Sequence, residues 1–409
     1  MIFRTLLSFY LLVIILNLEG LTGANTNPIE KGLLLIVSLV FVMTRRLNIT
    51  NLGLVFVLVG ATILSAVGTQ YEGFGLNRYF RGLISLVTPF LLLCAEPTEK
   101  DSRRLILLLA LSPLAAMILG VMYQAAGVRA IWYTDFLTAT RLQGSLSPAG
   151  LGSICYIGAI AATLQAAIDR RRLYLWLGLA AINGVILVLS AARMPLALTV
   201  LVCAVIYLTM VNPNVSGILM GVLAGIPAAA VVLLVFGQSL LARFESESLS
   251  GRELLWQHLE VALAYNPIFG VGIGHQILLI PERLKTLTTT MAAHNEYLRV
   301  AVETGYVGAA IIFMTIALMC LNICRQSRVG HRMAFLAICV SFFIFCRTDN
   351  AISSSITPFA LVLASFAFPR AWRHRKAQTE HDEGHEHLPA AAMHVPAHGR
   401  TGLPVRRFR

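Results

Sequence analysis

The sequence predicts an all-α polytopic membrane protein of about 12 transmembrane helices, with one large loop that contains short helices. The chain has 409 residues, of which 57% are hydrophobic and 13% charged, whereas soluble domains have about 45–50% apolar and about 25% charged residues. Its apolar residues gather in long runs without strict alternation, which favours membrane helices over strands. Twelve helices of about 20 residues would occupy about 240 residues, close to the apolar share.

The apolar runs predict the order of the membrane spans. They fall at 5–18, 32–44, 51–68, 79–95, 104–126, 148–168, 173–190, 195–211, 217–237, 298–322, 333–347 and 355–369. Spans 1–9 therefore lie within residues 1–237, and spans 10–12 within 298–369. Residues 238–297 form the large loop. Residues 370–409 are polar and contain six histidines, which predicts a disordered cytoplasmic tail.

The basic residues predict the orientation of the chain. The connections on the side of the two termini carry sixteen Lys and Arg residues up to position 376, and the short connections on the opposite side carry seven. Lys and Arg concentrate in cytoplasmic loops, so both termini are expected in the cytoplasm. The net charge of +12 is thus explained by membrane orientation, and no nucleic-acid partner is expected. The seven outer residues are Lys31, Arg78, Arg81, Arg129, Arg141, Arg193 and Arg347.

Most of these outer basic residues are arginine, which has two interpretations. The planar guanidinium matches the geometry of phosphate, so an anionic ligand on the outer face is one. Contact with lipid headgroups and ordinary ion pairs is the other. Arg193 lies in the short turn 190–195, and Pro195 fits the first turn of the next helix, so Arg193 is held at the membrane boundary.

The large loop is expected to contain an amphipathic helix. Ser250 and Glu253 have the spacing of a capping box, apolar residues then recur every three to four positions, and Asn266-Pro267 ends the helix. Arg252 lies in the first turn of this helix, where the helix dipole favours an acidic residue. Its position is therefore an indication of a bound anion.

A glycine-rich segment, 269–275, follows this helix. Glycines such as Gly272 and Gly274 can bring backbone N–H groups close to a ligand, or they can form a tight turn without one. The segment lacks the spacing of a dinucleotide-binding loop or a P-loop.

Charged residues gather where the loop meets the next span. Glu296, Arg299 and Glu303 lie on one helical face, so ion pairs among them are expected. His294 precedes the helix start, and imidazole suits proton transfer near neutral pH. A structural histidine is the alternative interpretation. The sequence shows no cluster of His, Asp or Glu on the outer side that would predict a metal. The seven cysteines all lie in or beside apolar runs and are expected to be buried hydrophobic residues.

Three segments together resemble a known family. They are Ser250-Gly251-Arg252 with Leu255-Trp256, then Asn266 to Gly274, then His294-Asn295-Glu296-Tyr297-Leu298 with Glu303-Thr304-Gly305. This pattern, over roughly residues 190–310, resembles the signature of the O-antigen ligase and polymerase superfamily. The resemblance implies a metal-independent, cofactor-free glycosyltransferase with a GT-C-like fold, whose active site faces the periplasm from the bacterial inner membrane.

The resemblance also implies substrates and residue roles. The donor is a glycan on undecaprenyl diphosphate, and a ligase transfers it to the lipid A–core oligosaccharide. Arg193 and Arg252 correspond to diphosphate contacts, and His294 to the group that assists the acceptor hydroxyl. His275 is not assigned a role. Further expected contacts with the diphosphate or the glycan are Arg141, Arg299, Glu296, Asn295, Gly272 and Gly274.

Two groups of alternatives remain at this point. An O-antigen polymerase, or a protein O-oligosaccharyltransferase, would share the donor and differ in the acceptor. A transporter of polyprenyl-linked glycans would bind the donor without chemistry. Transporters place charge near the middle of the membrane, whereas here charge gathers at the outer boundary, which favours the enzyme.

Overall fold

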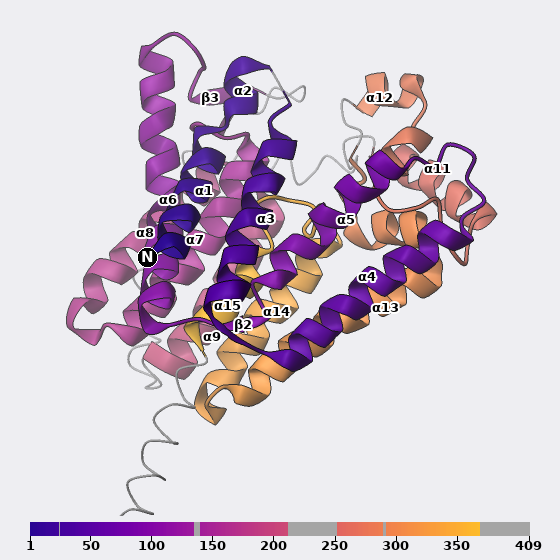
Figure 1. Cartoon of the computed structure of the whole chain (residues 1–409). Coiled ribbons are helices and arrows are strands. Elements are labelled where there is room, and N and C mark those ends of the chain that lie inside the picture. Colours follow the sequence, from indigo (N-terminus) through magenta and orange to yellow (C-terminus); the bar gives the residue numbers. More distant parts are fainter. Residues whose placement is uncertain (24, 135–139, 212–251, 289–291, 369–409) are drawn as a thin grey trace, which may run out of the picture. The chain divides into compact units, whose positions relative to one another are not determined.

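The computed structural model describes residues 1–23, 25–134, 140–211, 252–288 and 292–368 (Figure 1). The predicted span 217–237, the capping residue Ser250 and the tail 370–409 lie outside the described residues. The helices of four or more residues are α1 (Ile2–Leu16), α2 (Leu18–Thr22), α3 (Asn27–Thr44), α4 (Ile49–Gly68), α5 (Leu76–Leu91), α6 (Glu99–Ala125), α7 (Pro148–Ile168), α8 (Leu173–Leu189), α9 (Arg193–Ile206), η2 (Tyr207–Val211), α11 (Arg252–Tyr265), η3 (Gln276–Leu279), α12 (Glu282–Thr288), α13 (Glu296–Gln326), α14 (Arg332–Cys346) and α15 (Phe359–Ala367).

Short elements connect these helices. The single-turn helices η1 (Arg170–Arg172) and η4 (Val329–His331) precede α8 and α14. The strands β1 (Arg46–Leu47) and β2 (Ala95–Glu96) form one antiparallel pair, and β3 (Trp132–Thr134) and β4 (Thr140–Leu142) form another. Arg46 pairs with Glu96, and Trp132 pairs with Leu142. The prediction of an all-α membrane protein is therefore confirmed, with sheet limited to these two pairs among the described residues.

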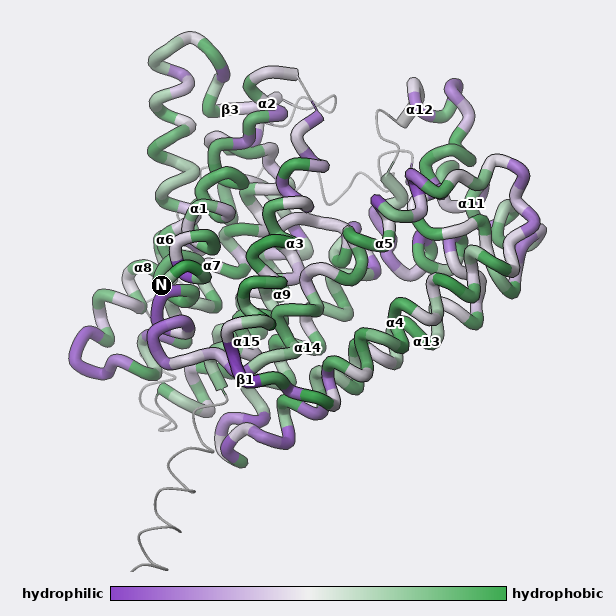
Figure 2. The backbone as a smooth tube through the Cα atoms, viewed as in Figure 1, coloured by the Kyte–Doolittle hydropathy of each residue, from purple (hydrophilic) through white to green (hydrophobic). Residues whose placement is uncertain are grey.

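Nine helical segments of the described residues are long and apolar enough to cross a membrane. They are Ile2–Thr22, Asn27–Thr44, Ile49–Gly68, Glu99–Ala125, Pro148–Ile168, Arg170–Leu189, Arg193–Val211, Glu296–Gln326 and Val329–Cys346. Polar residues concentrate at the ends of the helices and in the connections, whereas the helix bodies are mostly apolar (Figure 2). This is the distribution that a bilayer imposes on a multi-pass helical protein.

Two predicted spans differ from the structure. The run 79–95 forms α5, which is 16 residues long and contains Pro89 near its end. The run 355–369 is helical only in α15, over nine residues. Before α15, the Ser354 hydroxyl accepts hydrogen bonds from the backbone N–H groups of Ile356 and Thr357, so this segment forms turns instead of a helix. The sequence predicted a full-length membrane helix at each of these two positions. The structure corrects this, because α5 has 16 residues and α15 has nine.

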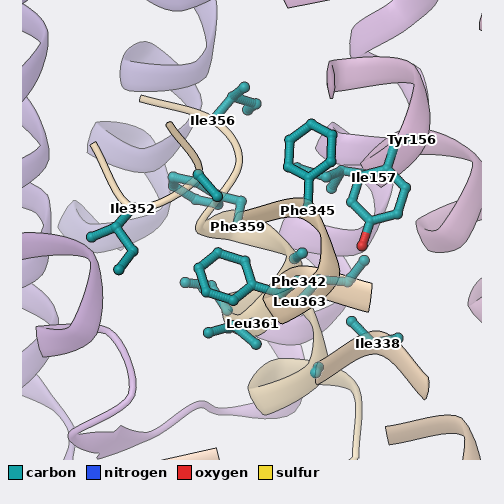
Figure 3. Close-up of a cluster of buried hydrophobic side chains, with 14 of the residues drawn as sticks. Tyr156, Ile157, Ile338, Phe342, Phe345, Ile352, Ile356, Phe359, Leu361 and Leu363 are labelled. Atoms are coloured by element: carbon teal, nitrogen blue, oxygen red, sulfur yellow. The ribbon is translucent and has the colours of Figure 1, made fainter. Parts of the chain in front are cut away.

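The core surrounds α7, which packs against α6, α8 and α9. Its small residues let neighbouring helices approach closely: a Cβ on Gly158 would lie 2.7 Å from the Pro113 side chain of α6. On another side, Tyr156 stacks on Phe345 of α14, with 5.8 Å between ring centroids. Figure 3 shows the cluster that α7, α14 and α15 share, in which Phe342 and Phe359 are fully buried. The segment between α14 and α15 is thereby held against the core.

Helices α4 and α13 lie side by side along much of their length (Figure 1). Near its start, α13 is interrupted at Gly305, whose φ of 69° and ψ of 174° are not helical. The backbone N–H of Tyr306 donates to the Pro267 carbonyl, 2.8 Å away, and the Ser65 hydroxyl of α4 donates to the Phe269 carbonyl at 2.6 Å. The interruption thus joins α4, α13 and the part of the large loop that follows α11.

Candidate active site

His294 forms a pair with Asp349, a residue 55 positions further along the chain. The Nδ1 atom of His294 lies 3.0 Å from Oδ1 of Asp349. An ionised carboxylate only accepts hydrogen bonds, so Nδ1 carries the proton, and the lone pair of a neutral ring is on Nε2. His294 has a φ of 47°, a backbone conformation that residues other than glycine rarely adopt and that is frequent at functional sites.

Helix α13 starts directly after His294. Asn295 caps the helix, because its side chain accepts a hydrogen bond from the Leu298 N–H at 3.2 Å. The predicted position of His294 ahead of the helix start is therefore confirmed. A histidine fixed on the backbone by a capped helix end can present its ring in one orientation.

Asp349 is ionised near neutral pH. Burial alone would raise its pKa, but the hydrogen bond and charge of His294, the N–H of Asn350 and the charge of Arg252 hold that pKa below its ordinary value of 3.8. A carboxyl group whose pKa is lowered by folding stabilises the folded protein at pH values above its ordinary pKa. This stabilisation is lost as the pH falls through the pKa of the folded state. The support that Asp349 gives to His294 therefore persists at all but strongly acidic pH.

Arg252 belongs to the same group of residues. It is the first residue of α11, and its Nη1 donates to the Thr348 carbonyl at 3.4 Å, one position before Asp349. Trp256, one turn further along α11, donates from Nε1 to the Ala293 carbonyl at 2.6 Å. The guanidinium of Arg347 lies 5.2 Å from the Trp256 ring centroid, within cation–π range. Helix α11 thus connects the residue before His294 to the segment 347–349.

Arg141 contacts the short turn that precedes Arg193. Arg141 of β4 donates from Nε to the Ser190 carbonyl at 3.0 Å, and Arg193 is the exposed first residue of α9. Ala192 lies against Gly152 in α7, one turn from Tyr156, which stacks on Phe345. The turn of Arg193 and the segment after α14 therefore both lie toward the start of α7.

The glycine-rich segment is bonded to α13. The N–H groups of Val271 and Gly272 donate to the carbonyls of Val302 and Glu303, at 3.0 and 2.8 Å. The φ angles of Gly270, Gly272 and Gly274 are positive, as a tight turn requires. The backbone N–H of Gly272 is therefore used within the chain, and the substrate contacts expected for Gly272 and Gly274 stay predictions.

His275, which follows the glycines, is a structural residue. It is fully buried, its Nε2 accepts a hydrogen bond from the Gly75 N–H at 2.8 Å, and its ring stacks on Phe74 with 4.9 Å between centroids. These bonds hold the glycine segment to the connection before α5.

Glu296, Arg299 and Glu303 form the ion pairs that their spacing predicts. Arg299 bonds to both carboxylates, and the two glutamates are 0% and 3% exposed. A buried group with two acidic residues and one basic residue is stabilised by a further cation nearby. Lys31 of α3 supplies it, because it interacts electrostatically with all three residues.

Replacing Arg299 with alanine is expected to lower the free energy of unfolding by about 3–5 kcal/mol, because two buried carboxylates would then face each other without the cation between them. The thermal unfolding of the purified protein in detergent measures this effect. Arg103→Ala is the matched control, because it breaks an exposed pair with Glu99, which is worth about 1 kcal/mol or less. Equal losses in the two variants would contradict the assigned burial of the charge cluster.

Asp349 is the site residue that sequence reasoning missed. Its only signal was the polar group Arg347-Thr348-Asp349-Asn350 at the end of an apolar run, where charge is costly. Among the described residues, no group of three or more His, Cys, Asp or Glu side chains could hold a metal ion. The arrangement instead offers an imidazole oriented by a carboxylate, with a guanidinium beside it.

One comparison with known proteins, the scan against family models, agrees with the sequence pattern. The family model described as O-antigen ligase matches residues 174–313. One solved structure, described as "Structural coordination of polymerization and crosslinking by a peptidoglycan synthase complex", aligns over 77% of this chain and 96% of its own, at 14% identity and a TM-score of 0.38. No curated protein matches the chain.

The matched segment begins in α8 and ends in α13, so it includes Arg193, Arg252 and His294. The family match supports ligase- or polymerase-type transfer of O-antigen, and the apolar helices support substrates linked to lipid. By its apolar helices the chain is a multi-pass helical membrane protein, and its residues 174–313 are similar to the O-antigen ligase family.

Proposed function

We propose that the protein is an O-antigen ligase. It transfers a glycan from undecaprenyl diphosphate to the lipid A–core oligosaccharide, without a metal or another cofactor, on the periplasmic side of the bacterial inner membrane. Both termini then lie in the cytoplasm, in accord with the excess of basic residues in the connections on that side. The observation that carries this proposal is the group of His294, Asp349 and Arg252.

The transfer reaction forms one bond to the anomeric carbon of the sugar and breaks another. The acceptor hydroxyl oxygen bonds to the anomeric carbon, the bond from that carbon to the diphosphate oxygen breaks, and the bonding electrons leave with undecaprenyl diphosphate. In this proposal His294 Nε2 takes the hydroxyl proton, and Asp349 orients the ring and stabilises the resulting imidazolium. Arg252 and Arg193 stabilise the negative charge that develops on the departing diphosphate. The energy comes from the donor, because its diphosphate is the leaving group.

Arg252 is the residue that tests donor activation. Arg252→Ala is expected to lower kcat about 10²- to 10³-fold, the usual cost of losing one donor that stabilises transition-state charge. Purified protein in detergent is incubated with lipid-linked glycan and lipid A–core, and the product is quantified on gels. Arg283→Ala is the control, because Arg283 is an exposed residue of α12. Undiminished transfer by Arg252→Ala, with a folded protein, would refute this role.

The product separates the ligase from its alternatives. A polymerase would lengthen the lipid-linked glycan without lipid A–core, and a protein O-oligosaccharyltransferase would glycosylate a polypeptide. A transporter would move the lipid-linked glycan across vesicle membranes without forming a glycosidic bond. Modified lipid A–core as the only product supports the proposal. Any of the other three outcomes, observed without modified lipid A–core, contradicts it.

A further inference from the structure

A cavity of about 180 Å³ lies between the start of α3 and α5. Lys31 and Arg81 line it together with the amides Asn25 and Asn27, and Pro28 and Ile84 contribute apolar walls. No residue of its lining is acidic. A cavity that presents two cations and two amides to solvent attracts an anionic group that also carries hydroxyls.

The two cations differ in how their charge is balanced. Lys31 is half-buried, its ammonium donates to the Ser85 hydroxyl at 2.5 Å, and it faces the cluster of Glu296, Arg299 and Glu303. With Lys31 included, that cluster has equal numbers of positive and negative groups. Arg81 is exposed and makes no hydrogen bond or ion pair with any residue that the structure describes. The charge of Arg81 is therefore available to a ligand.

The cavity adjoins the segment that holds the active site. Lys31 also lines a small hollow with Ser353, Ser354 and Ser355, four to six positions after Asp349. The Ser355 hydroxyl donates to the carboxylate of Glu30 at 2.7 Å, which turns that acid toward the serine segment. The same segment thus contributes Asp349 to the active site and serines to the surroundings of Lys31.

The hollow contains a further polar atom without a partner. The hydroxyl of Thr88 lines it, is 1% exposed, and has no hydrogen-bond partner among the described residues. Buried hydroxyls without partners are rare, and a single water in this hollow would supply the missing hydrogen bond.

We propose that Lys31 and Arg81 form a subsite for an anionic group, phosphoryl or carboxyl, carried by a saccharide of one substrate of the transfer. This inference rests on the proposed function and adds a charge requirement to it. The cavity is smaller than the pockets of about 300–1,000 Å³ that enclose drug-sized ligands, so it holds one charged sugar unit. Binding in this subsite positions the remainder of that substrate toward Asp349 and His294.

Binding of a soluble probe tests the subsite independently of transfer. Glucose 6-phosphate and neutral glucose are titrated into the wild-type protein in detergent, and binding is followed by saturation-transfer NMR. Glucose 6-phosphate is expected to bind and glucose is not. Arg81→Ala is expected to weaken binding about ten- to hundredfold, as for a lost charge-assisted hydrogen bond, and Arg283→Ala leaves it unchanged. Equal binding by Arg81→Ala and the wild type, or no binding by the wild type, would overturn the subsite.

The transfer assay then identifies which substrate uses it. Arg81→Ala is expected to raise KM for either the lipid-linked glycan or the lipid A–core, with little change in kcat. Phosphatase-treated lipid A–core distinguishes the two: if the acceptor occupies the subsite, its treatment removes the difference between Arg81→Ala and the wild type. If the donor occupies the subsite, a donor with a neutral glycan removes the difference between Arg81→Ala and the wild type. An unchanged KM for both substrates would refute the inference, while a chain that binds glucose 6-phosphate and transfers nothing would refute only the proposed function.

Discussion

Replacement of His294 by alanine is expected to lower the rate of glycan transfer about 10²- to 10⁴-fold, the usual contribution of a positioned acid–base group. The reason is geometric: Asp349 binds Nδ1 at 3.0 Å, so Nε2 is the nitrogen that can take the proton of the acceptor. The loss is expected in kcat, because the lost interaction exists chiefly in the transition state. Initial rates of transfer with purified protein at saturating donor and acceptor measure it.

A matched histidine controls for this experiment. His331→Ala changes the same side-chain type in η4, the short helix before α14, and is expected to leave the rate within about twofold of wild type, because His331 lies away from the group of His294, Asp349 and Arg252. His294→Gln keeps a polar side chain and is expected to remain as slow as His294→Ala, since an amide cannot accept the proton. Normal transfer by His294→Gln would assign His294 to orientation of the acceptor instead of proton removal.

Replacement of Gly305 by alanine is expected to lower the free energy of unfolding by more than about 4 kcal/mol, a loss that few single substitutions cause. A Cβ at this position would lie 2.0 Å from the Ile268 carbonyl oxygen, and the backbone has a φ of 69°. An alanine would therefore combine steric overlap with a backbone conformation that itself costs about 1–3 kcal/mol. Thermal unfolding and the fraction of monodisperse protein in detergent measure the result.

Gly60→Ala is the matched substitution for Gly305→Ala. Gly60 lies within α4, is exposed, and has no heavy atom within 4 Å of an added Cβ. Alanine is favoured over glycine in a helix interior by about 1 kcal/mol, so this variant is expected to be at least as stable as the wild type. Similar stability of the two variants would show that the interruption of α13 tolerates a side chain.

The helices could be predicted because their signal is local. Long apolar runs predict membrane helices from composition alone, and the amphipathic pattern with Asn266-Pro267 predicts the helix that the structure has as α11. The run 355–369 shows where this reasoning fails. Hydropathy measures the apolar content of a segment, and it does not detect that Ser354 and Pro358 favour turns until α15 begins. Phe359 is apolar because it fills the core, not because it faces lipid.

The candidate site, too, could be predicted from the sequence only where its signal is local. Pairing of Arg299 with Glu296 and Glu303 follows from helical spacing, and the position of His294 follows from the helix start. The partnership of His294 with Asp349 depends on how α14 packs in the protein, which no local pattern contains. The bonds of the glycine segment to Val302 and Glu303 depend on tertiary contact in the same way. A sequence can therefore indicate which residues carry chemistry, whereas their partners require the folded structure.

A structure with undecaprenyl diphosphate bound would show whether Arg252 and His294 contact the donor. The protein in lipid nanodiscs, with this lipid added, is suited to single-particle cryo-electron microscopy. We expect density for the diphosphate within about 3 Å of the Arg252 guanidinium, as charge-assisted hydrogen bonds require, with the His294 ring facing the position of the sugar. Diphosphate density at the opposite membrane face, or away from Arg252 and His294, would contradict this expectation.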